Sequence, residues 1–343
     1  MDMMRELITK DYNNVIISYW FWIDQFLMAG QVNNGELWLI NNFINLKYDV
    51  DAFPGGIYFA NNEYRDKMVE FYDCPYLLMQ KLMFDEKKKI ENKDIIDVLL
   101  KNISRGNFVI MMVDRFYLNV GWDKGNEHEL MVHGYDISKK CFYYADHTQD
   151  GRHKTGLSCS FSELKQAFEA PITYRESLEF KNTIFTFLPV QNLSYKLNLD
   201  HMIQQLKYYY HGDQNLFDNY YKSGIQVYYD LASYFNKQIV KKSKKMDIRG
   251  VTVLQDHNSA MVYRIEYLAK KLKRNFESLK LFEKLKKDSK KMVQCYLKFT
   301  ITKDYTILKK IIDILYMLDE NERMAIKLLI DELSSIKSES FNT

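Results

Sequence analysis

The sequence predicts an α+β domain over residues 1–192, followed by an all-helical domain over residues 193–343. Short apolar runs of strand length stand before residue 193, whereas later apolar residues recur at helical spacing in long segments. Proline, the strongest helix breaker, does not occur after Pro189. A chain of 343 residues is long enough for each of the two domains to bury its own core.

The first predicted element is a buried helix. Asn13 or Asn14 can cap a helix that runs to about Met28, and Gly30 follows its end. Its sequence, VIISYWFWIDQFLMA, is apolar on nearly every side, which is typical of a helix enclosed by other elements. Two short strands and a further helix are then expected, over residues 37–40, 56–60 and 61–72.

The clearest strand signals lie between residues 107 and 146. NFVIMMVD is an apolar run typical of a buried strand, and HELMVHGYD and KCFYYAD form a predicted β-hairpin around the turn DISKK. In chain order we expect a helix over 94–103, strands over 107–114, 128–136 and 140–146, a helix to about residue 168 capped by Ser160 or Ser162, and a closing strand over 182–190.

The second half shows amphipathic helical patterns and no internal repeat. Helices are expected over residues 198–211, 223–245, 250–275, 277–299, 303–317 and 320–334.

Several function classes lack sequence support. The four cysteines are widely spaced without a C-x-x-C pair, which excludes a disulfide scaffold and gives no zinc motif. No glycine-rich phosphate-binding motif occurs, so no nucleotide cofactor is expected. The N-terminus shows no signal-peptide pattern, and the apolar run over 15–28 is interrupted by Asp24 and Gln25 and is too short for a bilayer. We expect a soluble cytoplasmic protein without cofactors.

One pair of residues can carry chemistry. His128 begins one predicted strand, and Asp146 ends the next, eighteen residues later. An aspartate placed there can accept the Nδ1–H of the histidine, which fixes the tautomer and leaves Nε2 as a base. Asp114 and Tyr117 end the preceding strand and are candidates to line the same cleft.

Two other histidines lie close in sequence. His133 is five residues beyond His128 on one strand, so it should point to the opposite face and have a structural role. His147 could form a metal site with His128, but no third ligand stands at a recognisable spacing, so no metal is expected.

The stretch from Asp94 to Phe168 resembles the N-terminal domain of the butirosin biosynthesis protein H family. This is a papain-like, peptidase C39-related group from peptide and aminoglycoside antibiotic gene clusters. The segments that carry the resemblance are RGNFVIMMVDRFYLN, HELMVHGYD, KCFYYADHTQDG and SFSELKQAF, and LQDHNSAMVYRIEYL (254–268) resembles a helix of the family's second domain.

In that family a Cys-His-Asp triad transfers an acyl group from a carrier-protein thioester to an amine. The resemblance implies that His128 is the base and Asp146 the orienting acid. The cysteine should fall near 14–16, at the start of the first buried helix, where the sequence has none. Ser18 or Cys74 could replace it, His128 could deprotonate an amine or water directly, or the site could bind without forming an acyl-enzyme.

The resemblance implies an acyltransferase-like protein of nonribosomal peptide or antibiotic biosynthesis that acts in amide bond formation. Its partners would be an acyl or peptidyl carrier protein and a small-molecule or peptide acyl substrate, contacted by residues such as Asn13, Asn14 and Ser18. The alternative is a catalytically inactive binding or partner protein that uses the inherited cleft.

The charge distribution is consistent with either a carrier-protein partner or a solvated surface. Residues 195–343 hold 27 basic against 18 acidic side chains, so a basic helical face could dock an acidic carrier protein. The lysine runs lack interleaved aromatics and any known reader motif, so nucleic acid is not an expected partner.

Overall fold

The computed structural model describes residues 3–10, 15–49, 56–61, 68–84, 94–171, 183–212, 221–243 and 246–340. The chain has an α+β fold and divides into two compact units. The first unit comprises Met1–Asn13, Trp20–Glu36 and Phe71–Ser194, and the second comprises Asn14–Tyr19, Leu37–Glu70 and Tyr195–Thr343. The last boundary lies two residues from the expected division at 192, but two N-terminal segments belong to the helical unit.

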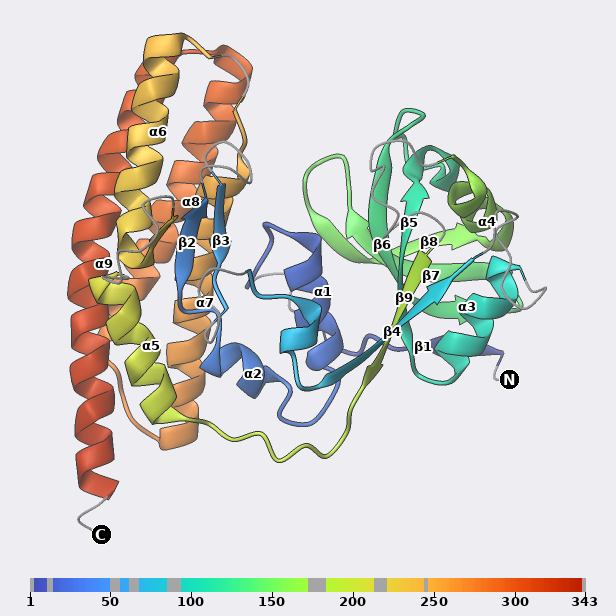
Figure 1. Ribbon diagram of the computed structural model, residues 1–343, viewed down its shortest axis with the longest axis horizontal. Coiled ribbons are helices and arrows are strands. Elements are labelled where there is room, and N and C mark those ends of the chain that lie inside the picture. Colours follow the sequence, from blue (N-terminus) through green and yellow to red (C-terminus); the bar gives the residue numbers. More distant parts are fainter. Residues whose placement is uncertain are drawn as a thin grey trace. The chain divides into compact units, whose positions relative to one another are not determined.

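The first unit is built on a seven-stranded antiparallel sheet (Figure 1). Along the sheet the order is β4-β9-β5-β6-β7-β8, and β1 also pairs with β6. Its strands are β1 (Met4–Glu6), β4 (Leu77–Met83), β5 (Phe108–Asp114), β6 (Glu127–Asp136), β7 (Cys141–His147), β8 (His153–Ser160) and β9 (Thr183–Pro189). The predicted hairpin of β6 and β7 is confirmed, as are the predicted strands that became β5 and β9.

Three α-helices and two short 3-10 helices complete this unit: α1 (Trp20–Ala29), α3 (Ile95–Ser104), α4 (Phe161–Glu169), η1 (Phe71–Asp73) and η2 (Arg115–Leu118). Asp94 caps α3 by accepting the main-chain N–H groups of Ile96 and Asp97. Ser160 and Glu163 form a reciprocal capping box at the start of α4. These caps confirm the helices predicted over 94–103 and up to residue 168.

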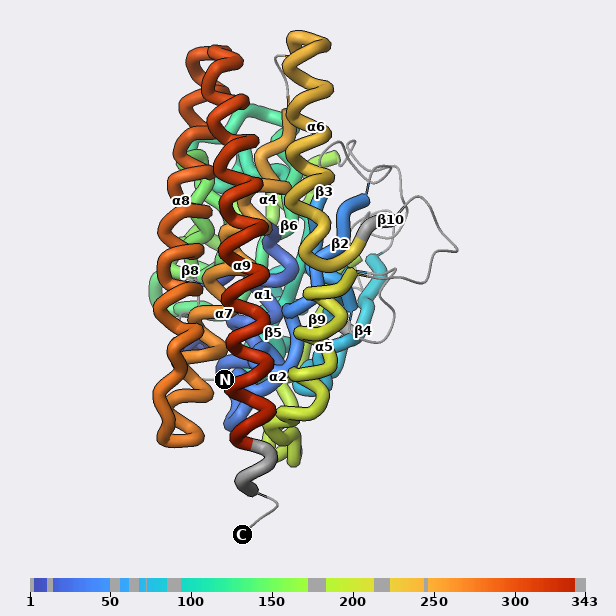
Figure 2. The backbone as a smooth tube through the Cα atoms, turned by 90° about the vertical axis from the view of Figure 1, so that its left-hand side faces the viewer, coloured from blue at the N-terminus to red at the C-terminus, as the bar shows by residue number. Residues whose placement is uncertain are grey.

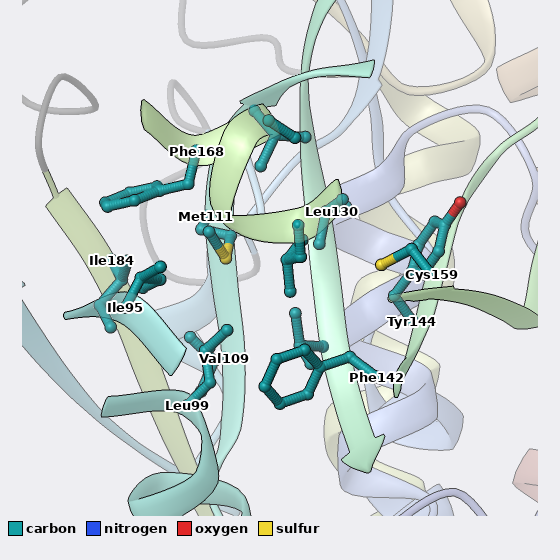
Figure 3. Packing of buried hydrophobic residues seen from close by; sticks show 14 of the residues in the cluster. Ile95, Leu99, Val109, Met111, Leu130, Phe142, Tyr144, Cys159, Phe168 and Ile184 are labelled. Atoms are coloured by element: carbon teal, nitrogen blue, oxygen red, sulfur yellow. The ribbon is translucent and has the colours of Figure 1, made fainter. Parts of the chain in front are cut away.

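The core of the first unit lies between the sheet and the helices α3 and α4 (Figure 3). Each fully buried large apolar side chain stabilises the fold by about 1.5–3 kcal/mol. Together they hold β5, β6 and β7 in register, which fixes where polar side chains on these strands lie. Labelled members of the cluster are Ile95 and Leu99 of α3, Val109 and Met111 of β5, Leu130 of β6, Phe142 and Tyr144 of β7, Cys159 of β8, Phe168 of α4 and Ile184 of β9.

Several predictions for the N-terminal region were wrong. The apolar run over 37–40 forms helix α2 (Glu36–Asn41) instead of a strand. The first long helix begins at Trp20, five residues later than expected. A helix was predicted over 61–72. The described residues 68–72 instead contain an isolated β-bridge from Met68 to Ala60 and the start of the 3-10 helix η1. Asn13 and Asn14 lie outside the described residues. Strands β1, β2, β4, β8 and β10 were not predicted.

The second unit combines a small antiparallel sheet with long helices. The sheet has the order β10-β2-β3, and α8 packs along both α7 and α9 (Figure 2). Its elements besides α2 are β2 (Leu46–Asp49), β3 (Gly56–Phe59), β10 (Tyr221–Ser223), η3 (Gly224–Gln226), α5 (Leu199–His211), α6 (Val227–Lys241), α7 (Arg249–Leu272), α8 (Ser278–Thr302) and α9 (Tyr305–Ser340).

The helical pattern of the second half was predicted with one error. Helices α5 to α8 follow the expected segments, and β3 confirms the strand expected over 56–60. The helices expected over 303–317 and 320–334 are one continuous helix, α9. Within the parts of the chain that the structure describes, no helix combines the length and apolarity needed to cross a membrane.

The residues before α1 are held by a buried carboxylate of the second unit. The main-chain N–H groups of Ile17 and Ser18 donate to Oδ2 of Asp256 in α7, at 3.0 and 2.8 Å. These bonds hold residues 17 and 18 in a non-helical conformation, so α1 starts later than its apolar pattern suggests. Burial raises the pKa of Asp256 to about 7, although the two N–H groups act in the opposite direction.

We expect Asp256→Asn to change the pH dependence of stability. Because the folded-state pKa of Asp256 lies above its unfolded value, the carboxyl group costs the protein stability as pH rises from about 4 to 7. Each pKa unit is worth about 1.4 kcal/mol, so the variant should gain a few kcal/mol relative to wild type across this range. Urea unfolding of the full chain at pH 4, 5.5, 7 and 8 measures this difference.

Asp304→Asn provides a control of opposite sign. The N–H and hydroxyl groups of Thr306 bind the exposed Asp304 carboxylate and lower its pKa. The stability that this carboxylate contributes is present above its unfolded pKa and is lost as pH falls through the folded one. Asp304→Asn should therefore lose stability relative to wild type as pH rises to about 4, and its curve should run nearly parallel to that of wild type between pH 4 and 8. Parallel curves for wild type and Asp256→Asn would contradict the expected effect of Asp256.

Candidate functional site

His128 and Asp146 lie together on neighbouring strands of the first unit. His128 is the second residue of β6 and stands opposite Val113 of β5. Its Nδ1 lies 2.9 Å from Oδ1 of Asp146 and 2.7 Å from the carbonyl oxygen of Glu129. The side chain of His128 is 24% exposed, whereas that of Asp146 is 3% exposed. The imidazole therefore faces solvent on one side, while the carboxylate behind it is enclosed.

The carboxylate of Asp146 is positioned by local strand geometry. A register shift between Tyr144 and Asp146 interrupts the pairing of β7 with β8, and such bulges redirect the side chains beside them. Oδ1 of Asp146 also accepts the main-chain N–H of His147 at 2.6 Å and lies 3.5 Å from Nη1 of Arg115. Three groups thus converge on one carboxylate oxygen.

Arg115 organises the loop next to this pair, which the sequence analysis did not predict. Its Nε donates to Oδ1 of Asn126 at 2.7 Å, and its Nη1 donates to the carbonyl oxygen of His147 at 3.2 Å. The guanidinium lies 4.0 Å from the ring centre of Trp122. Burial lowers the pKa of Arg115, and the charge of Asp146 opposes that change. The arginine therefore ties the η2 loop to the end of β7.

A second histidine–carboxylate pair lies beside the first. His153 of β8 is paired with His147 of β7, and their ring centres are 5.1 Å apart. Nε2 of His153 lies 3.4 Å from Oδ1 of Asp24 in α1. Burial raises the pKa of Asp24, while His153 acts in the opposite direction.

The sequence held one signal for this second pair. A charged residue inside an otherwise apolar helix, such as Asp24 in WFWIDQFLMA, must find a partner when the helix is buried. The identity of the partner was not predictable, because the strand that carries His153 was not recognised.

The two predicted cleft residues have other contacts. Asp114 is buried, and its carboxylate oxygens accept the N–H groups of Phe116 at 3.1 Å and Gly125 at 3.0 Å. Tyr117 packs against the core cluster and lies edge-on to the ring of Phe116. Asp114 thus stabilises the loop after β5. The contacts of Asp114 and Tyr117 do not indicate that either residue binds a ligand.

Cys74 and Ser18 are the residues that could replace the absent cysteine as nucleophile. Cys74 is 1% exposed, and burial raises its pKa to about 12, which is unfavourable for a nucleophile. Ser18 belongs to the second unit, where its main-chain N–H binds Asp256. His128 belongs to the first unit. Asn13 and Asn14 lie in the part of the chain left undescribed.

His133 and His147 differ in their surroundings. His133 is buried, its Nε2 lies 2.7 Å from the carbonyl oxygen of Thr155, and burial lowers its pKa to about 4, which supports a structural role. His147 instead forms a group with His128 and Asp146 in which one ligand-type atom per residue lies within 4.8 Å of the others. No third ligand was expected from sequence spacing, whereas in the structure Asp146 lies within this group.

Comparisons with family models and with curated protein sequences give no match. No model of a known protein family matches the chain, and no curated protein matches its sequence. The resemblance to the butirosin biosynthesis protein H family therefore stays a prediction.

Proposed function

We propose that the first unit is a papain-like acyltransferase-type domain that uses His128 as a general base without a covalent acyl-enzyme. In this function the domain would form amide bonds from acyl groups held by a carrier protein, in peptide or antibiotic biosynthesis. The proposal depends mainly on one observation, the 2.9 Å separation between Nδ1 of His128 and Oδ1 of Asp146.

The geometry of the pair fits this role. With Nδ1–H directed at Asp146 and at the carbonyl oxygen of Glu129, the imidazole has its lone pair on Nε2. The buried carboxylate stabilises the imidazolium that forms when Nε2 takes a proton. Partial exposure of the ring allows a substrate to approach it.

The proposed step balances without an enzyme thiol. Nε2 of His128 removes a proton from an acceptor amine while the amine nitrogen attacks the carbonyl carbon of an acyl thioester. The C–N bond forms, the C–S bond breaks, and the imidazolium returns its proton to the departing thiolate. A positioned base of this kind accelerates proton transfer by about 10²–10⁴-fold.

A second candidate function is binding without catalysis. Like the general-base proposal, it is favoured over covalent catalysis by the surroundings of His128, because the described contacts of His128 are Glu129, Asp146 and the ring of His147, with no thiol or hydroxyl group among them. In this case the site would hold an acyl chain, a peptide or a partner enzyme. Replacing His128 would then cost only about 1–2 kcal/mol of affinity for one hydrogen bond.

We expect His128→Gln to abolish acyl transfer. The assay uses S-acetyl-N-acetylcysteamine, a small mimic of a carrier-bound thioester, with glycinamide as acceptor, and detects the amide by mass spectrometry. A chelator is present throughout, so that no metal contributes. The variant should lose about 100-fold or more of the rate, because glutamine cannot take the proton.

His211→Gln is the matched control, since His211 is exposed at the end of α5 in the other unit. It should retain the wild-type rate. If the His128→Gln protein forms amide as fast as wild type, His128 is not the base. If wild type gives no amide above the protein-free reaction, general base catalysis on thioesters is contradicted and binding becomes the better description.

A further inference from the structure

We propose that His128, Asp146 and His147 form a binding site for a divalent transition-metal ion such as Zn²⁺. Each residue offers one ligand-type atom, and these atoms lie within 4.8 Å of one another. Two imidazoles with one carboxylate are a ligand set suited to zinc and its neighbours in the first transition row, and a poor set for Mg²⁺ or Ca²⁺, which favour oxygen ligands.

The first ligand nitrogen already lies beside the carboxylate. Nδ1 of His128 is 2.9 Å from Oδ1 of Asp146 and 2.7 Å from the carbonyl oxygen of Glu129. Nε2 is on the far side of the ring, so a cation bound there could not also reach Asp146. A cation shared with Asp146 would therefore bind Nδ1 in place of its proton.

The carboxylate also has a donor atom to spare. Its hydrogen bonds and ion pairs within the described chain, to His128, His147 and Arg115, are made through Oδ1. Oδ2 of Asp146 can therefore approach a cation on Nδ1 of His128 while Oδ1 keeps its contacts with His147 and Arg115. The hydrogen bond from the N–H of His147 to Oδ1 holds the second and third ligands, which are consecutive in sequence, in a fixed relation.

Surrounding charges set the expected affinity. Arg115 lies 3.5 Å from Asp146 and opposes a second cation nearby, whereas buried Glu129 and Asp24 favour one. A site with three protein ligands beside an arginine should bind less tightly than a four-ligand structural zinc site. We expect a dissociation constant on the order of micromolar, which corresponds to roughly −8 kcal/mol.

The metal and the proton would compete for one atom. A cation on Nδ1 of His128 would replace the N–H that Asp146 accepts and would oppose protonation of Nε2, so zinc would inhibit the proposed acyl transfer. The binding site itself does not rest on that activity, because the ligand geometry exists whether or not His128 acts as a base.

The test is metal binding to the full-length chain after removal of bound metal with a chelator. Calorimetric titration with Zn²⁺ should give one site per chain. Titration with Co²⁺ should produce visible absorption bands of a protein-bound ion that Zn²⁺ then abolishes. His147→Gln and His128→Gln should each weaken Zn²⁺ binding at least about 10-fold, on the scale that loss of groups at metal sites produces.

His211→Gln is again the matched control and should bind Zn²⁺ like wild type. Thermal unfolding in chelator establishes that each variant is folded before titration. Equal Zn²⁺ affinity in wild type and both site variants would contradict the proposal, as would the absence of a saturable site in wild type. The amide assay is run in chelator, so its result does not depend on metal binding. The metal site and the acyl transfer can therefore each be contradicted without the other.

Discussion

Arg264→Met should destabilise the protein by about 3–5 kcal/mol. Arg264 in α7 is fully buried and binds main-chain carbonyl oxygens at the end of α2: Nε donates to Ile40 at 2.8 Å, and Nη2 donates to Asn42 and lies 3.3 Å from the oxygen of Phe43. The last carbonyl groups of a helix have no donors within it. In the variant these oxygens would be buried without partners, each at a cost of about 1–3 kcal/mol.

The described hydrogen-bonding partners of Arg264 are main-chain carbonyl groups and the sulfur of Met261. Burial lowers the pKa of Arg264 to about 9. An apolar residue of similar size can replace a buried ion pair when both partners are exchanged. That compensation is not possible here, because main-chain carbonyl groups remain whatever the side chain is. The effect of Arg264→Met should therefore be large despite the similar volume of methionine.

Urea unfolding of the full chain measures this effect. The control is Arg274→Met, because Arg274 is exposed near the start of the segment after α7. The free energy of unfolding of the Arg274→Met protein should differ from that of wild type by about 0.5 kcal/mol or less. A loss below about 1 kcal/mol for Arg264→Met would show that water or rearranged backbone satisfies the carbonyl groups.

The second large effect is expected for Glu322→Leu, with a loss of about 3–5 kcal/mol. Glu322 is fully buried in α9 and joins α6 and α7: it accepts the hydroxyl of Tyr228 and lies 3.0 Å from Nδ1 of His257. Nε2 of His257 lies 2.9 Å from the carbonyl oxygen of Ile44. Burial keeps the pKa of Tyr228 well above its ordinary value, so the phenol remains a donor.

A double-mutant cycle tests whether these contacts form one network. Tyr228→Phe alone should cost about 1–2 kcal/mol. Combined with Glu322→Leu, it should cost about 1 kcal/mol less than the sum of the single changes, because both remove the same hydrogen bond. The control is Glu320→Leu, two residues away on the exposed side of α9, with an expected change of about 0.5 kcal/mol or less. Additive costs would mean that Tyr228 and Glu322 act independently.

The same network explains why α9 was predicted as two helices. The sequence Asp-Glu-Asn-Glu at 319–322 has the polarity of a connecting turn. In the structure Asp319 pairs with Arg323 on the same helix, and Glu322 binds the buried groups of α6 and α7. The polar sequence suggested an exposed turn, but Asp319 has its partner one helical turn away and Glu322 has partners that are remote in the chain.

The helix α2 shows a different limit of sequence analysis. A short run such as LWLI fits a buried strand or a buried helix equally well. Contacts decide between them, and here the donors of Arg264 satisfy the end of a helix more than 220 residues away in sequence. The strands β5 to β7 were predicted correctly because their length, alternation and turn signals are all local.

The candidate site was predicted in its central pair and missed in its surroundings. His128 and Asp146 lie on two strands of one hairpin, so their proximity follows from local sequence. Arg115, His153 and Asp24 come from three other elements. These three side chains come close to the pair because of the order in which the strands pair and because of the residues of α1 that face the sheet. Sequence spacing predicts neither the strand order nor the orientation of α1.

The long-range bonds of α7 have a consequence for synthesis of the protein on the ribosome. Asp256, His257 and Arg264 bind the main chain of residues 17–44, across 213 to 239 positions of sequence. At about 5–20 residues per second, roughly 11–48 s separate the emergence of the two segments. During that interval the apolar residues of the early segment have no partner from α7. The nascent chain should therefore depend on chaperones more than a protein whose contacts are local.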